Sequence, residues 1–259
     1  MTQGLTAAYG AFIAQLEFKA LPRAVVEVAR QGFTDCVGVM LAGSREPVTA
    51  AVEKVLLADQ SAGPASLYFS GKRASAPAAA WINGTAAHAL DYDDVALKGS
   101  HPSAVLVPAI LAEAQALNAS GRDMLVAYVA GYEVWADLIS RESGNYQRKG
   151  WHPTGVFGAI GAAAACASLH GLNATEAAHA LGVAASEASG VMSNLGSMVK
   201  PTHPGKAAAS GIYAARFAAA GISATAARLN TRRDSSPRSL QQARSTSNRL
   251  RACRLSIAI

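Results

Sequence analysis

GVFGAIGAAAACAS, at residues 155–168, is the longest apolar run in the chain and decides the expected fold. Glycine recurs at positions 155, 158 and 161, and alanine fills most of the remainder. Alanine is the strongest helix former, and small side chains let neighbouring helices approach closely. The run is shorter than the ~20 residues that a membrane helix needs. It therefore predicts a helix inside the core of a soluble, multi-helix protein.

Similar patterns flank this run on both sides. Half of the 259 residues are hydrophobic, but only 6% are aromatic, a mix that favours helices over sheets. Apolar positions recur at helical spacing and are separated by Gly, Pro or Asn. Residues 61–75 are rich in turn residues and predict a loop or a short extended piece. The fold class expected for residues 1–225 is all-α, with helices at 21–43, 47–58, 75–90, 103–119, 121–141, 154–170, 174–188 and 204–221.

The net charge of +6 is concentrated at the end of the chain. Residues 228–259 contain eight arginines and one acid, whereas the preceding residues are close to neutral. We expect residues 226–259 to be a separate Arg- and Ser-rich tail. Its arginines have no amphipathic period and no interleaved aromatics, so nucleic acid is not the expected partner.

Cysteine usage and the N-terminus predict the compartment. Cys36, Cys166 and Cys253 are far apart in the sequence, so neither a disulfide framework nor a thiolate metal site is indicated. The N-terminus has no basic segment followed by an apolar core. A cytoplasmic protein is expected.

Short polar segments interrupt the apolar helices at DYDDVALKGSHPS (91–103), RKGWHPTG (148–155), around Asn194, and at MVKPTHPGK (198–206). His101, His152 and His203 each precede a proline and each have a lysine within three residues. One such histidine is ordinarily a surface or capping residue. Three at helix entrances, with an aspartate cluster, predict a shared site that binds carboxylates and moves a proton.

Metal binding is the competing interpretation of the first segment. His88, Asp91, Asp93, Asp94 and His101 offer nitrogen and oxygen ligands. Their spacing matches neither a zinc-protease motif nor an EF-hand, so we expect no metal. A solvated helix end is the simpler alternative. Glycine-rich nucleotide loops are absent from the sequence.

The order of several segments resembles the MmgE/PrpD family. They are NGTAAHALDYDD with HPSAVLVPAILAEAQA, AYVAGYEVWADLISR, KGWHPTGVFGAIGAAAACASLHGL, ALGVAASEASGVMSN and KPTHPGKAAASGIYAARFAAAG. The resemblance implies a helical domain that forms homodimers and is followed by an α+β lid. It also implies a lyase or isomerase that needs no metal or organic cofactor. Such enzymes move a proton beside a carboxylate of a di- or tricarboxylic acid, as in 2-methylcitrate dehydratase.

When the roles of matching positions in the family are transferred to this sequence, the resemblance implies the catalytic residues. His101 would act as acid or base, Lys200 and His152 would bind substrate carboxylates, and Asp91 would orient a histidine or the substrate. His203 and Lys206 would also bind substrate, since they belong to the same motif as Lys200.

Two departures from the family pattern qualify these expectations. Val95 stands where dehydratase and decarboxylase members commonly have threonine, so the choice of substrate stays open. The tail does not resemble the family's lid, and we expect it to reflect a truncated or out-of-frame sequence. The alternative function is a non-catalytic helical dimer whose basic tail binds a polyanion.

Overall fold

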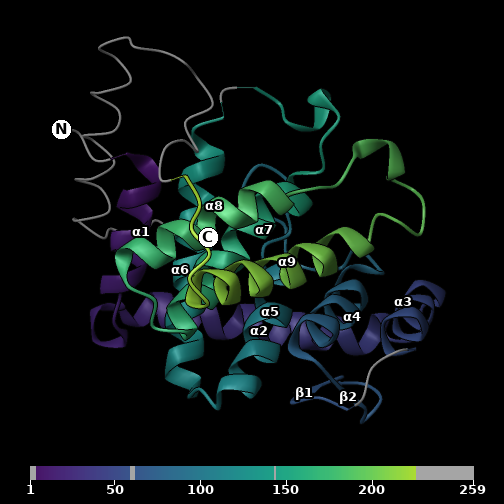
Figure 1. Cartoon of the computed structure of the whole chain (residues 1–259). Helices are drawn as coiled ribbons and strands as arrows, with labels where there is room; N and C mark the ends of the chain where they lie inside the picture. Colours follow the sequence, from purple (N-terminus) through teal and green to yellow (C-terminus); the bar gives the residue numbers. More distant parts are fainter. Residues whose placement is uncertain (1–3, 59–61, 143, 226–259) are drawn as a thin grey trace.

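A computed structural model describes residues 4–58, 62–142 and 144–225 (Figure 1). Within these ranges the fold is all-α, as expected, with one two-stranded antiparallel ribbon. The helices are α1 (Leu5–Gln15), α2 (Arg23–Gly43), α3 (Pro47–Leu57), α4 (Ala76–His88), α5 (Ser103–Leu117), α6 (Gly121–Ser140), α7 (Pro153–Leu169), α8 (Ala174–Glu187) and α9 (Thr202–Ala219). In the described part of the chain, short 3-10 turns lie between some of them: η1 (Phe18–Ala20), η2 (Gln147–Lys149) and η3 (Met192–Asn194).

The alanine-rich run forms a buried helix at the centre of the core, which confirms the helix expected there. It lies in α7, which packs against α5, α6, α8 and α9. Most α7 residues are buried, and His152 lies at the N-cap of this helix. A Cβ atom added to Gly211 of α9 would lie 2.3 Å from Ala162 Cβ of α7, so only glycine permits this helix crossing.

Helix α4 is the second buried helix, and it packs against α5 and α9. Pro77 lies in its first turn, where the missing N–H is not needed. A Cβ atom on Gly205 of α9 would lie 2.2 Å from the carbonyl oxygen of Trp81. This close approach places the N-terminal end of α9 beside the C-terminal end of α4, and these two ends carry residues of the candidate site.

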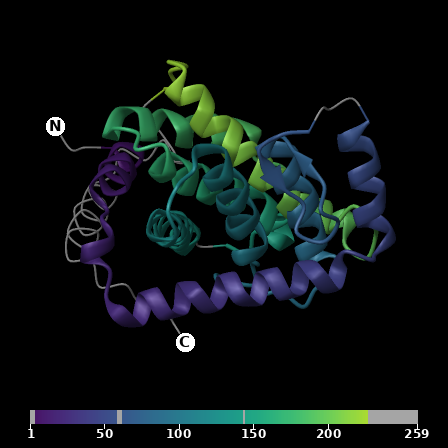
Figure 2. The ribbon, with the colours of Figure 1, turned by 90° about the horizontal axis from the view of Figure 1, so that it is seen from below.

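Helix α2 is amphipathic, and helices α6 and α8 begin with side-chain caps. Helix α2 is the long violet helix along one side of the molecule in Figure 2, with one face buried against α4, α5 and α6. Helices α6 and α8 begin with capping boxes, in which Ser120 pairs with Asp123 and Asn173 with Glu176. These reciprocal hydrogen bonds satisfy backbone N–H groups that a helix start leaves free.

Each predicted helix is present with ends within two residues of those expected. Helix α1, which packs mainly on α8, was not expected from the sequence. The expected loop at 61–75 contains the ribbon, formed by β1 (Ala65–Ser66) and β2 (Arg73–Ala74). No helix in the described ranges is long and apolar enough to cross a membrane. The expected tail, 226–259, lies outside the described residues, so the structure does not test the expected domain boundary between residues 225 and 226.

Candidate active site

The DYDD segment follows the last turn of α4 and folds back over it. The φ angles of Asp91, Leu97 and Lys98 are 57°, 48° and 61°, in the left-handed region that non-glycine residues seldom adopt. The loop is closed by a pair of backbone hydrogen bonds between Ala96 and Ser100. The chain therefore reverses direction between α4 and α5, and residues at the two ends of the loop meet.

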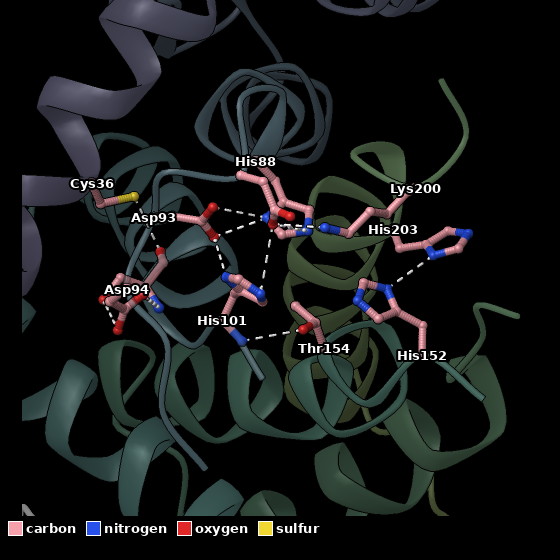
Figure 3. A network of polar contacts seen from close by, with 11 residues as sticks. Cys36, His88, Asp93, Asp94, His101, His152, Thr154, Lys200 and His203 are labelled. Carbon is pink, nitrogen blue, oxygen red and sulfur yellow. Dashed lines mark hydrogen bonds and ion pairs between the residues drawn. The ribbon is translucent and has the colours of Figure 1, made fainter. Parts of the chain in front are cut away.

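Asp93 is the buried centre of this meeting point (Figure 3). Its two carboxylate oxygens each lie 2.9 Å from His88 Nδ1, and Oδ2 lies 3.2 Å from His101 Nδ1. Burial raises the pKa of Asp93, but contacts with His101 and His88 outweigh this effect and hold the pKa at about 2. Asp93 is therefore ionised at neutral pH and fixes the orientation of both imidazole rings.

Asp91 lies on the open side of the same rings, with a side chain that is 55% exposed. Its Oδ1 atom is 2.6 Å from Lys200 Nζ, 3.7 Å from His101 Nε2 and 3.8 Å from His88 Nε2. Burial acts to raise the pKa of Asp91, but its contact with Lys200 and the nearby histidines lower it. One carboxylate oxygen thus lies among three nitrogen groups that can carry positive charge.

His101 is mostly buried between the two aspartates. Its backbone N–H donates to Thr154 Oγ1 of α7 at 3.2 Å, which ties the loop to the second polar segment. Burial lowers the pKa of His101, but Asp93 and then Asp91 raise it above its ordinary value. The structure therefore favours a protonated imidazole at the edge of the site.

His152 and His203 form the adjoining side of the site. Their Nδ1 atoms are 3.0 Å apart, and the His152 ring lies 6.0 Å from that of His88. Burial, His203 and other nearby positive groups lower the pKa of His152 to about 3, and burial also lowers the pKa of His203. Both rings are therefore neutral at pH 7, so one donates a hydrogen bond and the other accepts it.

Asp94 faces away from this cluster and supports it. Its oxygens accept hydrogen bonds from the backbone N–H and the hydroxyl of Ser103 at the start of α5. Ser103 Oγ also lies 2.9 Å from the Tyr128 hydroxyl. Burial raises the pKa of Asp94 to about 6 despite these hydrogen bonds. This network fixes the start of α5, immediately after His101.

The four residues expected to be catalytic meet at one place. Asp91 forms an ion pair with Lys200 and lies 3.7 Å from His101. His101, Lys200 and His152 lie around the same space in Figure 3. His203 joins the group through His152.

Lys206 points elsewhere. Its Nζ atom donates to Ser210 Oγ at 2.8 Å and lies 3.7 Å from Glu187 and 5.4 Å from the Trp81 ring centre. Its expected contact with substrate stays a prediction.

Two central residues were not assigned to the catalytic site from the sequence. His88 and Asp93 had been considered only as metal ligands, yet they hold His101 in place. The H-x-x-D-x-D spacing of residues 88–93 was the available signal, because it places a histidine and two carboxylates within six residues at the end of an expected helix. Potential ligand atoms of His88, Asp91, Asp93 and His101 all lie within 4.8 Å of one another, so these residues could also hold a metal ion.

A buried helical core with a site built of imidazoles, carboxylates and a lysine is typical of an enzyme that handles protons and anions. The profile of the MmgE/PrpD N-terminal domain matches residues 8–240, or most of the chain. The chain belongs to the MmgE/PrpD family. This match confirms the resemblance seen in the sequence, and it extends 15 residues past the boundary expected at 225.

Several similar proteins are named cis-aconitate decarboxylase or cis-aconitate decarboxylase-like. The chain is 39% identical to human cis-aconitate decarboxylase over 149 residues, which cover 56% of this chain and 31% of that protein. It is 31% identical to the cis-aconitate decarboxylase-like protein oryM of Aspergillus oryzae over 225 residues, 80% of this chain and 45% of that protein. Cis-aconitate decarboxylase of Aspergillus terreus is 28% identical over 85% of this chain and 47% of its own length. The chain thus spans 31–47% of the length of these relatives.

Proposed function

We propose that this chain forms the helical part of a lyase-type active site for a small di- or tricarboxylic acid. The reaction would move a proton beside a substrate carboxylate. The observation that carries the proposal is the convergence of Lys200 and His101 on one carboxylate oxygen of Asp91, whose side chain is half-exposed. A substrate carboxylate reaching this point would find the same nitrogen donors that now contact Asp91.

The roles of the residues follow from charge and exposure. Lys200, as an ammonium group, would bind a substrate carboxylate. His101, whose protonated form Asp93 favours, would donate a proton and, once neutral, accept one. Neutral His152 would hydrogen-bond a second carboxylate or a hydroxyl, and Asp91 would position the substrate or the imidazole.

The relatives' names favour cis-aconitate as the first acid to test, with decarboxylation as the reaction. Decarboxylation replaces a carboxylate on carbon by a proton, so it needs a proton donor at that carbon, which His101 would supply. Dehydration of a 2-methylcitrate-like acid needs a base at the neighbouring carbon and an acid at the leaving hydroxyl. Both reactions need a proton donor, so His101 would suit either of them.

The proposal is tested by proton exchange. The purified chain is incubated in heavy water with cis-aconitate, citrate and succinate, and NMR follows both deuterium uptake beside the carboxylate and product formation. We expect uptake or turnover with at least one acid, its loss in His101→Gln, and its retention in His179→Gln, which alters a histidine outside the cluster. The proposal would be contradicted if the folded chain caused neither deuterium uptake nor turnover with any of the acids. Equal deuterium uptake in His101→Gln and His179→Gln would also contradict it.

A further inference from the structure

His203 lies behind His152, at the outer side of the site. The Nδ1 atoms of the two rings are 3.0 Å apart, and the ring centres are 5.2 Å apart. His152 is 3% exposed, whereas His203 is only half-buried. In Figure 3 the second ring nitrogen of His152 is on the side of His101 and Lys200, and that of His203 points away from them. His203 thus reaches the site through His152.

The backbone holds these two rings against each other. The backbone N–H of His152 donates to the carbonyl oxygen of Gly190 at 3.0 Å. Gly190 has a φ angle of 119°, and a Cβ atom there would lie 3.3 Å from His203 Nδ1 and 3.6 Å from His152 Cβ. The glycine therefore lets the loop before η3 pass close to both histidines, and the loop fixes their contact together with α7 and α9.

The contact between the two Nδ1 atoms holds one proton. If His152 Nδ1 carries it, His152 Nε2 has a lone pair; if His203 Nδ1 carries it, His152 Nε2 bears a proton. The hydrogen bond thus determines whether His152 accepts or donates toward the site. Burial and positive neighbours lower the pKa values of both rings, so neither takes up a further proton at neutral pH.

The charges around His152 favour the first arrangement. Lys200 and the protonated form of His101 place positive charge near the His152 ring. His152 is also the N-cap of α7, where the helix dipole is positive. A lone pair that faces positive charge is stabilised, whereas an N–H group that faces it is repelled. His203 then carries its proton on Nε2, where water can accept it, because this ring is half-buried.

We propose that His203 is a positioning residue, which holds His152 in the tautomer with the proton on Nδ1. His152 Nε2 then presents an acceptor to the site. An acceptor repels a carboxylate and binds a hydroxyl group, so His152 takes a hydroxyl of the bound acid rather than one of its carboxylates. This consequence rests on the proposed function, whereas the tautomer itself does not.

The test is long-range ¹H–¹⁵N correlation NMR of the full chain, labelled with ¹⁵N-histidine and kept at neutral pH without ligand. A ring nitrogen that bears a proton differs clearly in ¹⁵N shift from one that has a lone pair. His152→Gln identifies the His152 signals by their loss. We expect the proton of His152 on Nδ1 and that of His203 on Nε2. The reverse arrangement would overturn the proposal.

Two variants of His203 separate positioning from packing. His203→Asn keeps an oxygen acceptor near the place of Nδ1 and should leave His152 in the same tautomer. His203→Phe keeps a ring but no acceptor, so the two nitrogen shifts of His152 should move towards each other as both tautomers become populated. His179→Gln, outside the cluster, is the control and should leave these shifts unchanged. Unchanged His152 shifts in His203→Phe would also overturn the proposal.

Calorimetric titration tests the consequence for the substrate. Citrate and propane-1,2,3-tricarboxylate differ by one hydroxyl group. We expect the native chain to bind citrate about 2–10-fold more tightly, the effect of one hydrogen bond, and His152→Phe to lose this preference. Equal binding of the two acids to the native chain would overturn the assignment of the hydroxyl. A chain that binds neither acid would contradict the proposed function, while the positions of the ring protons would still decide the role of His203.

Discussion

Replacing Glu133 by glutamine should stabilise the protein at alkaline pH. Glu133 lies largely buried in α6, one turn before Asp137, which is already paired with Tyr9 and Arg141. Burial and then the charge of Asp137 raise the pKa of Glu133 from 4.5 to about 7. A raised pKa means that the folded state favours the neutral acid, so folding with an ionised Glu133 costs free energy.

The sign and size follow from proton linkage. The contribution of Glu133 to stability is fully present below pH 4.5 and is lost as pH rises through about 7. At about 1.36 kcal/mol per pKa unit, the full difference is about 3 kcal/mol. Solvent reaches part of this side chain and screens it, so we expect Glu133→Gln to raise the free energy of unfolding by ~1–2 kcal/mol at pH 8.

Urea denaturation measured at pH 8 and at pH 4 tests this reasoning. The stabilisation should be present at pH 8 and largely absent at pH 4, where the native glutamate is also neutral. Glu27→Gln, on the exposed face of α2, is the matched control and should show no such difference. A Glu133→Gln protein that is destabilised at pH 8, or equally stabilised at both pH values, would refute it.

Three further predictions concern packing, a buried ion cluster and the site. Gly205→Val should lower the free energy of unfolding by more than ~2 kcal/mol, measured by urea denaturation, because its Cβ would overlap the Trp81 carbonyl. Glu113→Gln should cost ~3 kcal/mol in the same assay, because Glu113 is fully buried and pairs with His170 and Arg216. NMR titration should find His152 neutral down to pH 4, since its pKa is about 3; protonation near pH 6.5 would contradict the described burial.

Most of the fold could be predicted from the sequence because alanine, glycine and proline mark it so clearly. Gly43 and Pro47 separate two helices, and Pro153 opens the central one, close to the expected positions. Helix α1 was missed, because its LTAAYGAFIAQ sequence has no side-chain cap and little amphipathic contrast. Its helical form depends on packing against α8, which local sequence does not report.

Most members of the candidate site were predictable, but the central places of His88 and Asp93 and the contacts between the members were not. The repeated His-Pro pattern correctly pointed to three segments that meet in space. The buried position of Asp93, by contrast, depends on the left-handed turn at Asp91, a conformation that aspartate adopts only occasionally. Lys206 has the residue type expected of an anion ligand, but its place on α9 directs it to Ser210 and Glu187.

Calorimetric titration with cis-aconitate tests the central claim, that Lys200 and its neighbours form a carboxylate-binding site, most directly. A charge-assisted hydrogen bond contributes about 1.5–3 kcal/mol, so Lys200→Met should weaken binding at least about tenfold. Lys54→Met, which alters an exposed lysine on α3, should bind like the native chain. Equal affinity in the native and Lys200→Met proteins would contradict the account.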